Sequence, residues 1–267
     1  MPFVVYSLMD PTSINAAEAL KSSARFEEAD PLQGRRHFIS HDLPGVEMLE
    51  ISEPHINADF LDSLVRTDLV FFLSRHRSAA GVPSFTVHPE GNWSEEAKLG
   101  GKPRELGVAA PAAMLNVLKK MSTLPTKDID VTYEATHHGP LLTTPSLYLE
   151  VGGNDDIVNS KPLAAGLAGC LVRALTEADE GFDKVAVGVG STHYPSKFTK
   201  LALEGKYAFA HMMPKHFVTE VDMLQQAFDR SRPKPEVCVV EWASVNATQR
   251  KGILDKLNEL GIEYVRV

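Results

Sequence analysis

The sequence predicts an α/β protein with a mostly parallel, twisted β-sheet and helices on both faces of that sheet. Short runs rich in β-branched and aromatic residues alternate along the chain with longer segments of helical periodicity. Most of the short runs are continuously apolar, which is typical of strands that are covered on both faces. Alternating strand and helix units favour parallel pairing through helical crossovers.

The expected strands cover residues 2–8, 68–74, 129–136, 146–151, 184–190 and 237–242. The expected helices cover residues 59–66, 105–121, 163–180, 217–230 and 248–260. Pro111 should kink or delay the second of these helices, because proline lacks the N–H group and clashes with the preceding turn. Gly261 follows the last helix in the position of a C-terminal cap.

The length of 267 residues suits one large α/β domain, and no internal repeat or low-complexity run divides the chain. We therefore expect a single domain over residues 1–267 with long loops near residues 26–54 and 88–106. The first loop is rich in His, Asp, Gly and Pro and is expected to be irregular. The second is Gly-rich, and its part from Gly91 to Gly101 is expected to form a mobile flap over the substrate.

The composition, 43% hydrophobic and 23% charged, is ordinary for a globular protein and argues against a membrane protein. No run approaches the roughly 18 apolar residues that cross a bilayer, and the first residues lack the basic segment of a signal peptide. Cys170 and Cys238 are far apart and form no Cys-x-x-Cys pair. We therefore expect a reducing, cytoplasmic environment rather than a disulfide scaffold.

The net charge of −8, from 27 Lys and Arg against 35 Asp and Glu, argues against extensive nucleic-acid binding. A protein that grips long stretches of duplex normally has a positive surplus, because its cations neutralise phosphates. Any contact with RNA is therefore expected to be brief and confined to a local basic patch.

Ten histidines are distributed unevenly, and several follow strand-like runs directly. In open α/β sheets ligands bind beyond the carboxyl ends of the strands. A lone histidine there is more often a hydrogen-bonded structural group, but five clusters in the same structural position indicate a common cleft. The clusters are Ser-Arg-His-Arg-Ser (74–78), Val-His-Pro-Glu-Gly-Asn (87–92), Glu-Ala-Thr-His-His-Gly-Pro (134–140), Gly-Ser-Thr-His-Tyr-Pro (190–195) and Ala-His-Met-Met-Pro-Lys-His (210–216).

The cluster from Glu134 to His138 continues a β-rich run, so we expect it to be the end of a strand. Alternation then places Glu134 and His138 on one face and His137 on the other. A carboxylate that orients a ligating imidazole is a recurrent arrangement, so His138 is expected to bind metal and His137 to contact substrate. The two histidines can converge only if Gly139-Pro140 turns the chain. The plainer alternative is that one histidine faces solvent and the other packs in the core.

A strand enters a glycine turn at Gly188-Val189-Gly190 and leaves it through His193. Glycine allows a backbone to approach a ligand closely, and the N–H groups of a helix start, here near Lys197, bind anions. Arg75 and Lys215 flank histidines of two other clusters and can supply the local basic patch. The ordinary alternatives are a plain strand-to-helix turn and solvated surface cations.

Imidazole and carboxylate side chains together suit metal-assisted hydrolysis. They can hold zinc, which lowers the pKa of bound water and polarises a carbonyl group, and a further His or Glu can shuttle the proton. The sequence has no Gly-x-Ser-x-Gly elbow, no Walker loop and no Gly-x-Gly-x-x-Gly after a strand. Serine hydrolases, P-loop proteins and Rossmann cofactor-binding proteins are therefore disfavoured.

Taken together, these clusters resemble the archaeal and plant D-aminoacyl-tRNA deacylases. The matching motifs occur in the family's order between about residues 68 and 216, and jointly they are specific. They are Ser74-Arg75-His76, Val87-His88-Pro89-Glu90-Gly91-Asn92, Thr136-His137-His138-Gly139-Pro140, Gly188-Val189-Gly190 with His193-Tyr194-Pro195, and Ala210-His211 with Pro214-Lys215-His216. One departure is Ser191-Thr192, where glycine or another small residue is expected before the histidine.

The resemblance implies a phosphorylase-like or peptidyl-tRNA-hydrolase-like α/β fold, dependence on Zn²⁺, and hydrolysis of the ester in D-aminoacyl-tRNA as chiral proofreading. It also implies contact with the acceptor end of tRNA, by a monomer or small homo-oligomer. The expected catalytic residues are His76, Glu134, His137, His138 and His193, and the expected metal ligands are His76, His138, Glu150 and His193. The expected substrate-binding residues are Arg75, Asn92, Gly190, Tyr194, Lys197, His211 and Lys215.

Two other functions remain open at this point. One is a metal-dependent amidase or peptidase of small amino-acid derivatives, which the acidic charge would suit. The other is a non-catalytic metal- or nucleotide-binding module, which would bind ligand without turnover of any activated ester. For Glu150 the alternative is a charged position at a sheet edge.

Overall fold

The computed structural model describes residues 1–77, 81–125, 128–178 and 181–267. Its strands are β1 (Pro2–Ser7), β2 (Phe26–Leu32), β3 (Arg35–Ser40), β4 (Glu47–Ile51), β5 (Leu69–His76), β6 (Ser84–His88), β7 (Val108–Ala109), β8 (Asp130–Tyr133), β9 (Pro145–Gly152), β10 (Lys184–Ser191), β11 (Tyr207–Pro214), β12 (Val237–Val240) and β13 (Glu263–Arg266). Its helices are α1 (Pro11–Ser23), α2 (Leu61–Leu64), α3 (Pro111–Ser122), α4 (Asp155–Val158), α5 (Lys161–Thr176), α6 (Ser196–Leu203), α7 (Leu224–Asp229) and α8 (Ala247–Glu259). Single 3₁₀ turns are η1 (His55–Asn57), η2 (Lys215–Phe217), η3 (Val221–Met223) and η4 (Trp242–Ser244).

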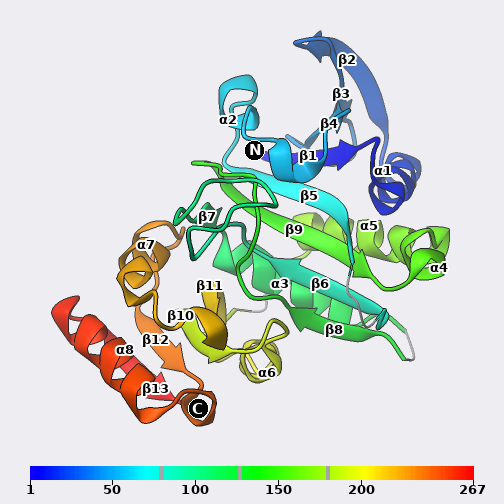
Figure 1. Ribbon diagram of the computed structural model, residues 1–267. Coiled ribbons are helices and arrows are strands. Elements are labelled where there is room, and N and C mark those ends of the chain that lie inside the picture. The colour runs from blue at the N-terminus through cyan, green and yellow to red at the C-terminus, as the bar shows by residue number, and fades with distance from the viewer. Residues whose placement is uncertain (78–80, 126–127, 179–180) are drawn as a thin grey trace.

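The strands form two sheets rather than one (Figure 1). The larger sheet has nine strands, in the order β2-β3-β4-β1-β5-β9-β6-β8 with β7 paired to β9. The smaller sheet has four strands in the order β11-β10-β12-β13. The predicted α/β class is confirmed, whereas the expectation of one sheet is wrong, because apolar runs identify strands but not their neighbours.

Most of the strand pairings are parallel, as predicted, but three are not. Every pairing in the smaller sheet is parallel. In the larger sheet β6 runs antiparallel to β9, and β3 runs antiparallel to both β2 and β4. The larger sheet is therefore mixed, and the reversal at β6 determines how the strand ends are placed around the site.

The expectation of an irregular excursion at residues 26–54 is wrong, because this segment contains β2, β3 and β4. β2 lies at the edge of the sheet, and its charged residues reach solvent on both faces. Such a strand lacks the continuous apolar run that the prediction required. Residues 89–106 do form the expected long loop, with no helix or strand of their own apart from isolated bridges at Glu90 and Gly91.

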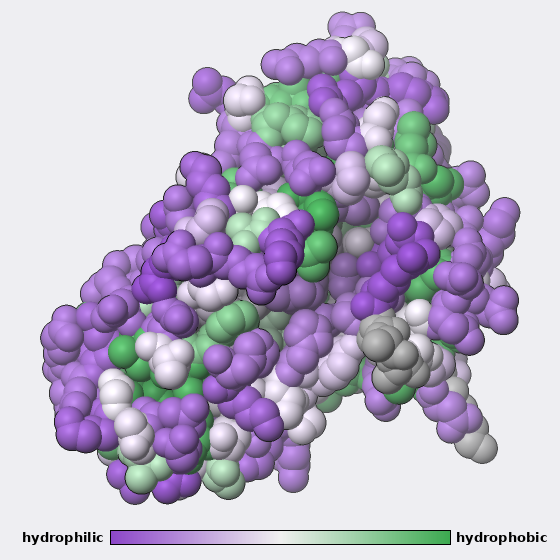
Figure 2. Space-filling view, viewed as in Figure 1, coloured by the Kyte–Doolittle hydropathy of each residue, from purple (hydrophilic) through white to green (hydrophobic). Residues whose placement is uncertain are grey.

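Helices cover both sheets. α1, α3 and α5 pack on one face of the larger sheet, and the main hydrophobic core there continues into the smaller sheet beside α6. α7 and α8 cover the other face of the smaller sheet, and η1 and α2 cover part of the opposite face of the larger one. Within the described residues no helix is long and apolar enough to span a bilayer. Most of the face drawn in Figure 2 is hydrophilic, with apolar residues in small separate patches.

Several helix boundaries differ from the expected ones. Pro111 is the first residue of α3, so it delays the start of this helix, which is one of the two effects expected, and does not kink it. The helix expected over 217–230 is divided between turns and the short α7. α5 ends at Thr176, and residues 179–180 of its expected range lie outside the described residues. α1 is not predicted by periodicity, because it packs on small side chains such as Ala16.

The buried carboxylate of Asp10 joins the start of α1 to the end of β5. Its Oδ1 atom accepts a hydrogen bond from the N–H of Ser13 (3.1 Å) and so caps the helix. Its Oδ2 atom accepts from the N–H of Arg75 (2.8 Å) and from the hydroxyl of Ser74 (3.2 Å). These contacts fix the backbone that leads directly into His76.

Replacement of Asp10 should therefore destabilise the fold. We expect Asp10→Ala to lower the free energy of unfolding by about 1 to 3 kcal/mol, because a helix cap is lost and buried donors lose their acceptor. Asp10→Asn retains one oxygen for the cap and should lose less. Urea unfolding followed by circular dichroism measures the difference, and unchanged stability of Asp10→Ala would contradict this role.

Candidate active site

Two histidines and a glutamate share one face of the larger sheet across β5, β9 and β6. The register places Ser74, Glu150 and Thr86 side by side on these three strands. Side chains alternate between the faces of a strand. His76 and His88, each two residues further along its strand, therefore lie on the same face as Glu150.

The rings of His76, His137, His138 and His193 lie close together, as predicted, but the expectation that they meet at one common carboxyl edge is wrong. β9 runs parallel to β5 but antiparallel to β6, so the carboxyl ends of β5 and β6 point in opposite directions. Their last residues still converge, because His76 and His88 lie on either side of Glu150 along β9. The site therefore lies over a sheet face between two opposed strand ends.

The loop after β8 adds a second carboxylate and two more imidazoles. β8 ends one residue before Glu134, so the strand is shorter than expected. The backbone of His138 has a φ of 41°, and the Gly139-Pro140 peptide bond that follows is cis. The predicted alternation of His137 and His138 on a strand is therefore wrong. Their rings lie 4.4 Å apart between centroids, because the chain turns at this point.

Glu134 is fully buried, and its Oε2 atom is the meeting point of three imidazoles. Nε2 of His193 lies 2.8 Å from this oxygen, and Nδ1 of His76 lies 3.1 Å from it. Nε2 of His137 is more distant, at 3.6 Å. The other ring nitrogen of His76 lies 2.6 Å from the hydroxyl of Tyr194, so this histidine is held at both ends.

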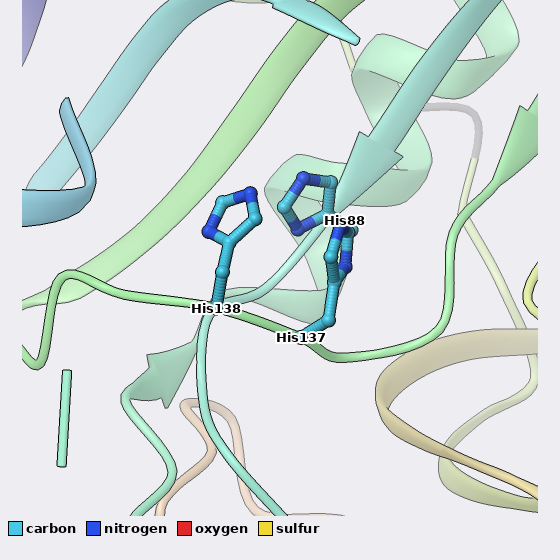
Figure 3. Close-up of side chains that lie close together, drawn as sticks. All are labelled: His88, His137 and His138. Carbon is cyan, nitrogen blue, oxygen red and sulfur yellow. The ribbon is translucent and has the colours of Figure 1, made fainter. Parts of the chain in front are cut away.

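Glu150, the second buried carboxylate, lies between His76 and His88. Its Oε2 atom is 3.6 Å from Nδ1 of His76 and 3.4 Å from Nε2 of His88. The ring of His88 lies 4.3 Å from that of His137 and 4.9 Å from that of His138, between centroids. Figure 3 shows these three rings close together, one from the end of β6 and two from the loop after β8.

Three of the imidazoles have the tautomer that metal binding requires. In each, Nδ1–H donates to a backbone carbonyl, which leaves the lone pair of Nε2 free and fixes the ring. The bonds run from His88 to Pro89 (3.2 Å), from His137 to Ala135 (2.8 Å) and from His138 to Gly139 (2.6 Å). Ligand atoms of the three histidines lie within 4.8 Å of one another.

Two further groups of three ligand atoms lie equally close, namely His76 with Glu134 and His193, and His88 with Glu134 and Glu150. Among the described residues, Nε2 of His88, Oε1 of Glu134 and Oε2 of Glu150 are buried without a hydrogen-bond partner. Buried polar atoms normally have one, so a cation here would satisfy atoms that the protein leaves unsatisfied. Imidazole nitrogen and carboxylate oxygen are ligands of zinc.

The two carboxylates remain ionised although they are buried. Burial raises the pKa of Glu134, but hydrogen bonds from His193 and His76 outweigh it and hold the pKa well below its usual value. Burial opposes ionisation of Glu150 as well, yet His76 and His88 lower its pKa to about 2. Burial disfavours the charged form of His76, but Glu134 and Glu150 raise its pKa to about 11.

The remaining imidazoles differ in charge. Burial lowers the pKa of His138 to about 4 and holds the pKa of His137 well below its usual value, so both are neutral at pH 7. Burial also opposes protonation of His88, but the adjacent Glu150 raises its pKa above the usual value. The site therefore combines negative carboxylates, positive imidazoles and neutral imidazoles with free lone pairs.

Three of the expected substrate-binding residues lie beside this cluster or next to it in the chain. Tyr194 is 36% exposed and contacts His76. Gly190 has a φ of 94°, and a Cβ there would lie 2.9 Å from Oγ of Ser244, so this turn requires glycine. The N–H of Arg75, the residue before His76, donates to Asp10.

The other expected substrate-binding residues lie outside the cluster. Lys197 is exposed and lies 3.5 Å from Glu241, and Lys215 is exposed on η2. His211 is fully buried, and its ring nitrogens lie 3.2 Å from the hydroxyl of Thr136 and 3.0 Å from the carbonyl of Arg230. The structure therefore keeps His211 within the core.

Asn92 helps to hold the loop for which the sequence predicts a flap. Its side-chain amide donates to the carbonyls of Gly100 (2.9 Å) and Lys102 (3.2 Å). The N–H of Gly91 donates to the carbonyl of His138 (2.7 Å), which ties the loop to the cluster. The mobility of this loop stays a prediction.

Sequence reasoning assigns no role to His88 or Glu90, although both occur in one of the histidine clusters. Glu90 is buried, and its Oε2 atom accepts a hydrogen bond from the hydroxyl of Ser146 (3.0 Å). Burial raises the pKa of Glu90 to about 7. The available indication is the position of both residues at the exit of the apolar run 84–87, which is too short to stand out as a strand.

We expect His88→Ala to lose bound metal, because His88 belongs to two of the three ligand groups. Metal content per folded protein, measured by plasma mass spectrometry after zinc loading, should fall well below that of the wild type. His41→Ala is the control, since His41 is half-exposed and pairs with Glu27 away from the cluster. Full metal content in His88→Ala would exclude this histidine from the ligand set.

Known proteins match the chain closely in sequence. The profile of the D-aminoacyl-tRNA deacylase family matches residues 64–265. D-aminoacyl-tRNA deacylase of Pyrococcus furiosus is 33% identical over 276 residues and covers 100% of both chains. The protein of the same name from Ignicoccus hospitalis is 35% identical over 270 residues, which is 99% of this chain and 98% of that relative.

A solved structure matches the fold as well. The crystal structure of a conserved protein of unknown function superposes with a TM-score of 0.90 at 29% sequence identity, over 100% of this chain and 95% of that one. The resemblance inferred from the motifs is thus supported by a profile that covers more than half of the chain and by full-length relatives. The chain belongs to the D-aminoacyl-tRNA deacylase family.

Proposed function

We propose that the protein hydrolyses the ester bond between a D-amino acid and the terminal ribose of tRNA at this histidine–glutamate cluster, releasing free D-amino acid and tRNA. The proposal rests on one observation: in a chain that belongs to this family, the cluster has a buried layer and a partly exposed layer. Its buried layer consists of His76, His88, Glu134 and Glu150, and its partly exposed layer consists of His137, His138 and His193. Removal of D-amino acids in this way is chiral proofreading.

We assign the principal zinc site to His88, His137 and His138. One ring nitrogen of each lies within 4.8 Å of the others, and three nitrogen ligands would leave a coordination position open for substrate or water. Zinc bound there supplies a Lewis acid that polarises the ester carbonyl and lowers the pKa of water. His76, His193 and Glu150, the other ligands expected from the sequence, belong to the adjoining groups and offer room for a further ion.

His193 is the side chain best placed to move a proton. Its side chain is 39% exposed, whereas the Glu134 carboxylate to which it donates is fully buried. Glu134 stabilises the imidazolium that forms when Nδ1 of His193 takes a proton. The same nitrogen can return that proton to the ribose oxygen as the ester bond breaks. His76, whose other ring nitrogen contacts the Tyr194 hydroxyl, also contacts the Glu134 carboxylate and so helps to orient this pair.

The partner we propose is the acceptor end of the tRNA and not its body. Lys197 and Lys215 are exposed just beyond the carboxyl ends of β10 and β11. Lys197 is close to His193 in the chain, and Lys215 follows Pro214, which pairs with Ser191 at the end of β10. With Arg75 they are the cations we propose for phosphate contact. Few such contacts suit a chain with a net charge of −8. We further propose a single cytoplasmic domain that acts as a monomer or small homo-oligomer.

The function is tested with D-tyrosyl-tRNA and L-tyrosyl-tRNA, each with and without a chelator. We expect hydrolysis of the D ester to be at least about tenfold faster, loss of activity with the chelator, and recovery with Zn²⁺. An amidase of small amino-acid derivatives would hydrolyse D-tyrosine esters that lack tRNA as fast as it hydrolyses D-tyrosyl-tRNA. A binding module would turn over neither substrate.

Substitutions within the cluster should separate metal binding from proton transfer. His137→Ala and His138→Ala should each lose zinc and rate together, because both rings face the shared space, whereas strand alternation alone predicts a ligand only at His138. His193→Ala should keep the zinc of the principal site, to which His193 does not belong, and lose roughly 10²–10⁴ in rate, as for a general acid–base. Metal content and D-aminoacyl-tRNA hydrolysis are measured on the same folded samples. Zinc loss in His193→Ala with retention in His137→Ala would reverse the assignment.

A further inference from the structure

Two cavities adjoin the cluster, and the proposed substrate has two parts, one on each side of its ester bond. The first, here called the histidine cavity, has a volume of about 440 Å³, and its walls include His137, His138, Trp93, Leu99 and Phe217. The second, here called the helix cavity, has a volume of about 630 Å³ and lies against β6, β8 and α6. Tyr194 is in its wall and lies between this cavity and His76.

We propose that the histidine cavity receives the side chain of the D-amino acid and favours apolar and aromatic side chains. This inference rests on the proposed function. It goes further by naming the part of the substrate that the site selects, which is the side chain of the D-amino acid.

The position of the cavity is the first argument. The amino-acid side chain is attached to the carbon next to the ester carbonyl, whereas the adenine base lies across the ribose ring from the ester oxygen. A pocket for the side chain must therefore touch the residues that act on the carbonyl. His137 and His138 form part of the wall of the histidine cavity. The helix cavity reaches the cluster through Tyr194 and is better placed for the adenosine.

The chemistry of the walls is the second argument. The indole N–H of Trp93 donates to the backbone carbonyl of Thr136 (3.0 Å), so its ring offers mainly carbon surface. Leu99 is 58% exposed, and an apolar ligand would cover part of it. The two charged residues in the wall, Glu96 and Lys98, form an ion pair with each other. Apolar pockets with a few oriented polar groups are typical ligand sites.

The wall is also held in place by the site itself. The N–H of Gly139 donates to the carbonyl of Leu99 (3.0 Å), and the N–H of Gly91 donates to the carbonyl of His138 (2.7 Å). These bonds join the loop that carries Leu99 to the backbone of a proposed zinc ligand. The loop that lines the cavity is therefore attached directly to the backbone of the cluster.

The helix cavity has a different character and provides the matched control. Three charged residues, Asp130, Lys200 and Glu204, lie in its wall, together with several hydroxyl groups. Leu203, which is 37% exposed, occupies a place in this wall comparable to that of Leu99 in the histidine cavity. A tryptophan at either exposed position would fill part of one cavity without disturbing the hydrophobic core.

The experiment compares Leu99→Trp with Leu203→Trp on D-phenylalanyl-tRNA and D-alanyl-tRNA. We expect Leu99→Trp to lower kcat/KM for the D-phenylalanyl ester by about tenfold or more, and to change it by less than about twofold for the D-alanyl ester. Leu203→Trp should leave the ratio between the two substrates unchanged. An equal fall for both esters in Leu99→Trp, or a changed ratio only in Leu203→Trp, would overturn the assignment.

A binding measurement separates this inference from the proposed function. The probe is the amide of D-phenylalanine with 3′-amino-3′-deoxyadenosine, which cannot be cleaved as an ester, titrated into zinc-loaded protein by calorimetry. Weaker binding to Leu99→Trp than to the wild type supports the cavity assignment even if no D-aminoacyl-tRNA is hydrolysed, in which case the proposed function alone fails. Binding unaffected by Leu99→Trp, or no binding to the wild type, would overturn it.

Discussion

The burial of two ionised carboxylates, Glu134 and Glu150, is the constraint on which the rest of the site depends. A carboxylate removed from water costs several kcal/mol unless cations or hydrogen bonds compensate it. Here the compensation comes from imidazoles, and His76 contacts both carboxylates at once. The oxygens that remain unsatisfied point to a further positive charge at the same place. The buried cluster could therefore hold a metal ion.

This constraint explains the mixed sheet. In a wholly parallel sheet β5 and β6, on either side of β9, would end at the same edge, and Glu150 would not lie between His76 and His88 along β9. Because β6 runs against β9, the two strand ends approach Glu150 from opposite sides. The smaller sheet remains parallel, and the end of β10 leads into His193, whose ring completes the contacts to Glu134.

Much of the fold can be predicted from the sequence where burial leaves a simple pattern. The runs that form β5, β9, β10 and β12 are mostly apolar, and their positions are predicted correctly to within a few residues. β2 and β3 cannot be found in this way, because both carry charged residues and reach solvent. Which strands are neighbours, and in which direction they run, depends on long-range packing that no local pattern records.

The candidate site, like the fold, can be predicted only in part from the sequence. Clustering and position along the chain are enough to identify His76, His137, His138 and His193 as candidates. The predicted relation between His137 and His138 is wrong, because alternation applies only to an extended strand and the chain turns at His138. His88 is missed because the short run that forms its strand carries too weak a pattern. Residue type and spacing thus identify the candidate site residues. The backbone turn at His138 determines which ring nitrogen faces the space between the histidines.

The negative net charge of the chain and the buried cluster are consistent with one way of binding the substrate. A net charge of −8 gives the body of a tRNA little attraction at long range. In the proposed mode of binding, affinity comes mainly from the substrate end, where the amino acid would enter the histidine cavity and the ester would meet the imidazoles. Once the ester is cleaved, the amino-acid side chain no longer tethers the RNA to this cavity. A protein that holds its substrate mainly through the group it removes releases the product because of the reaction itself.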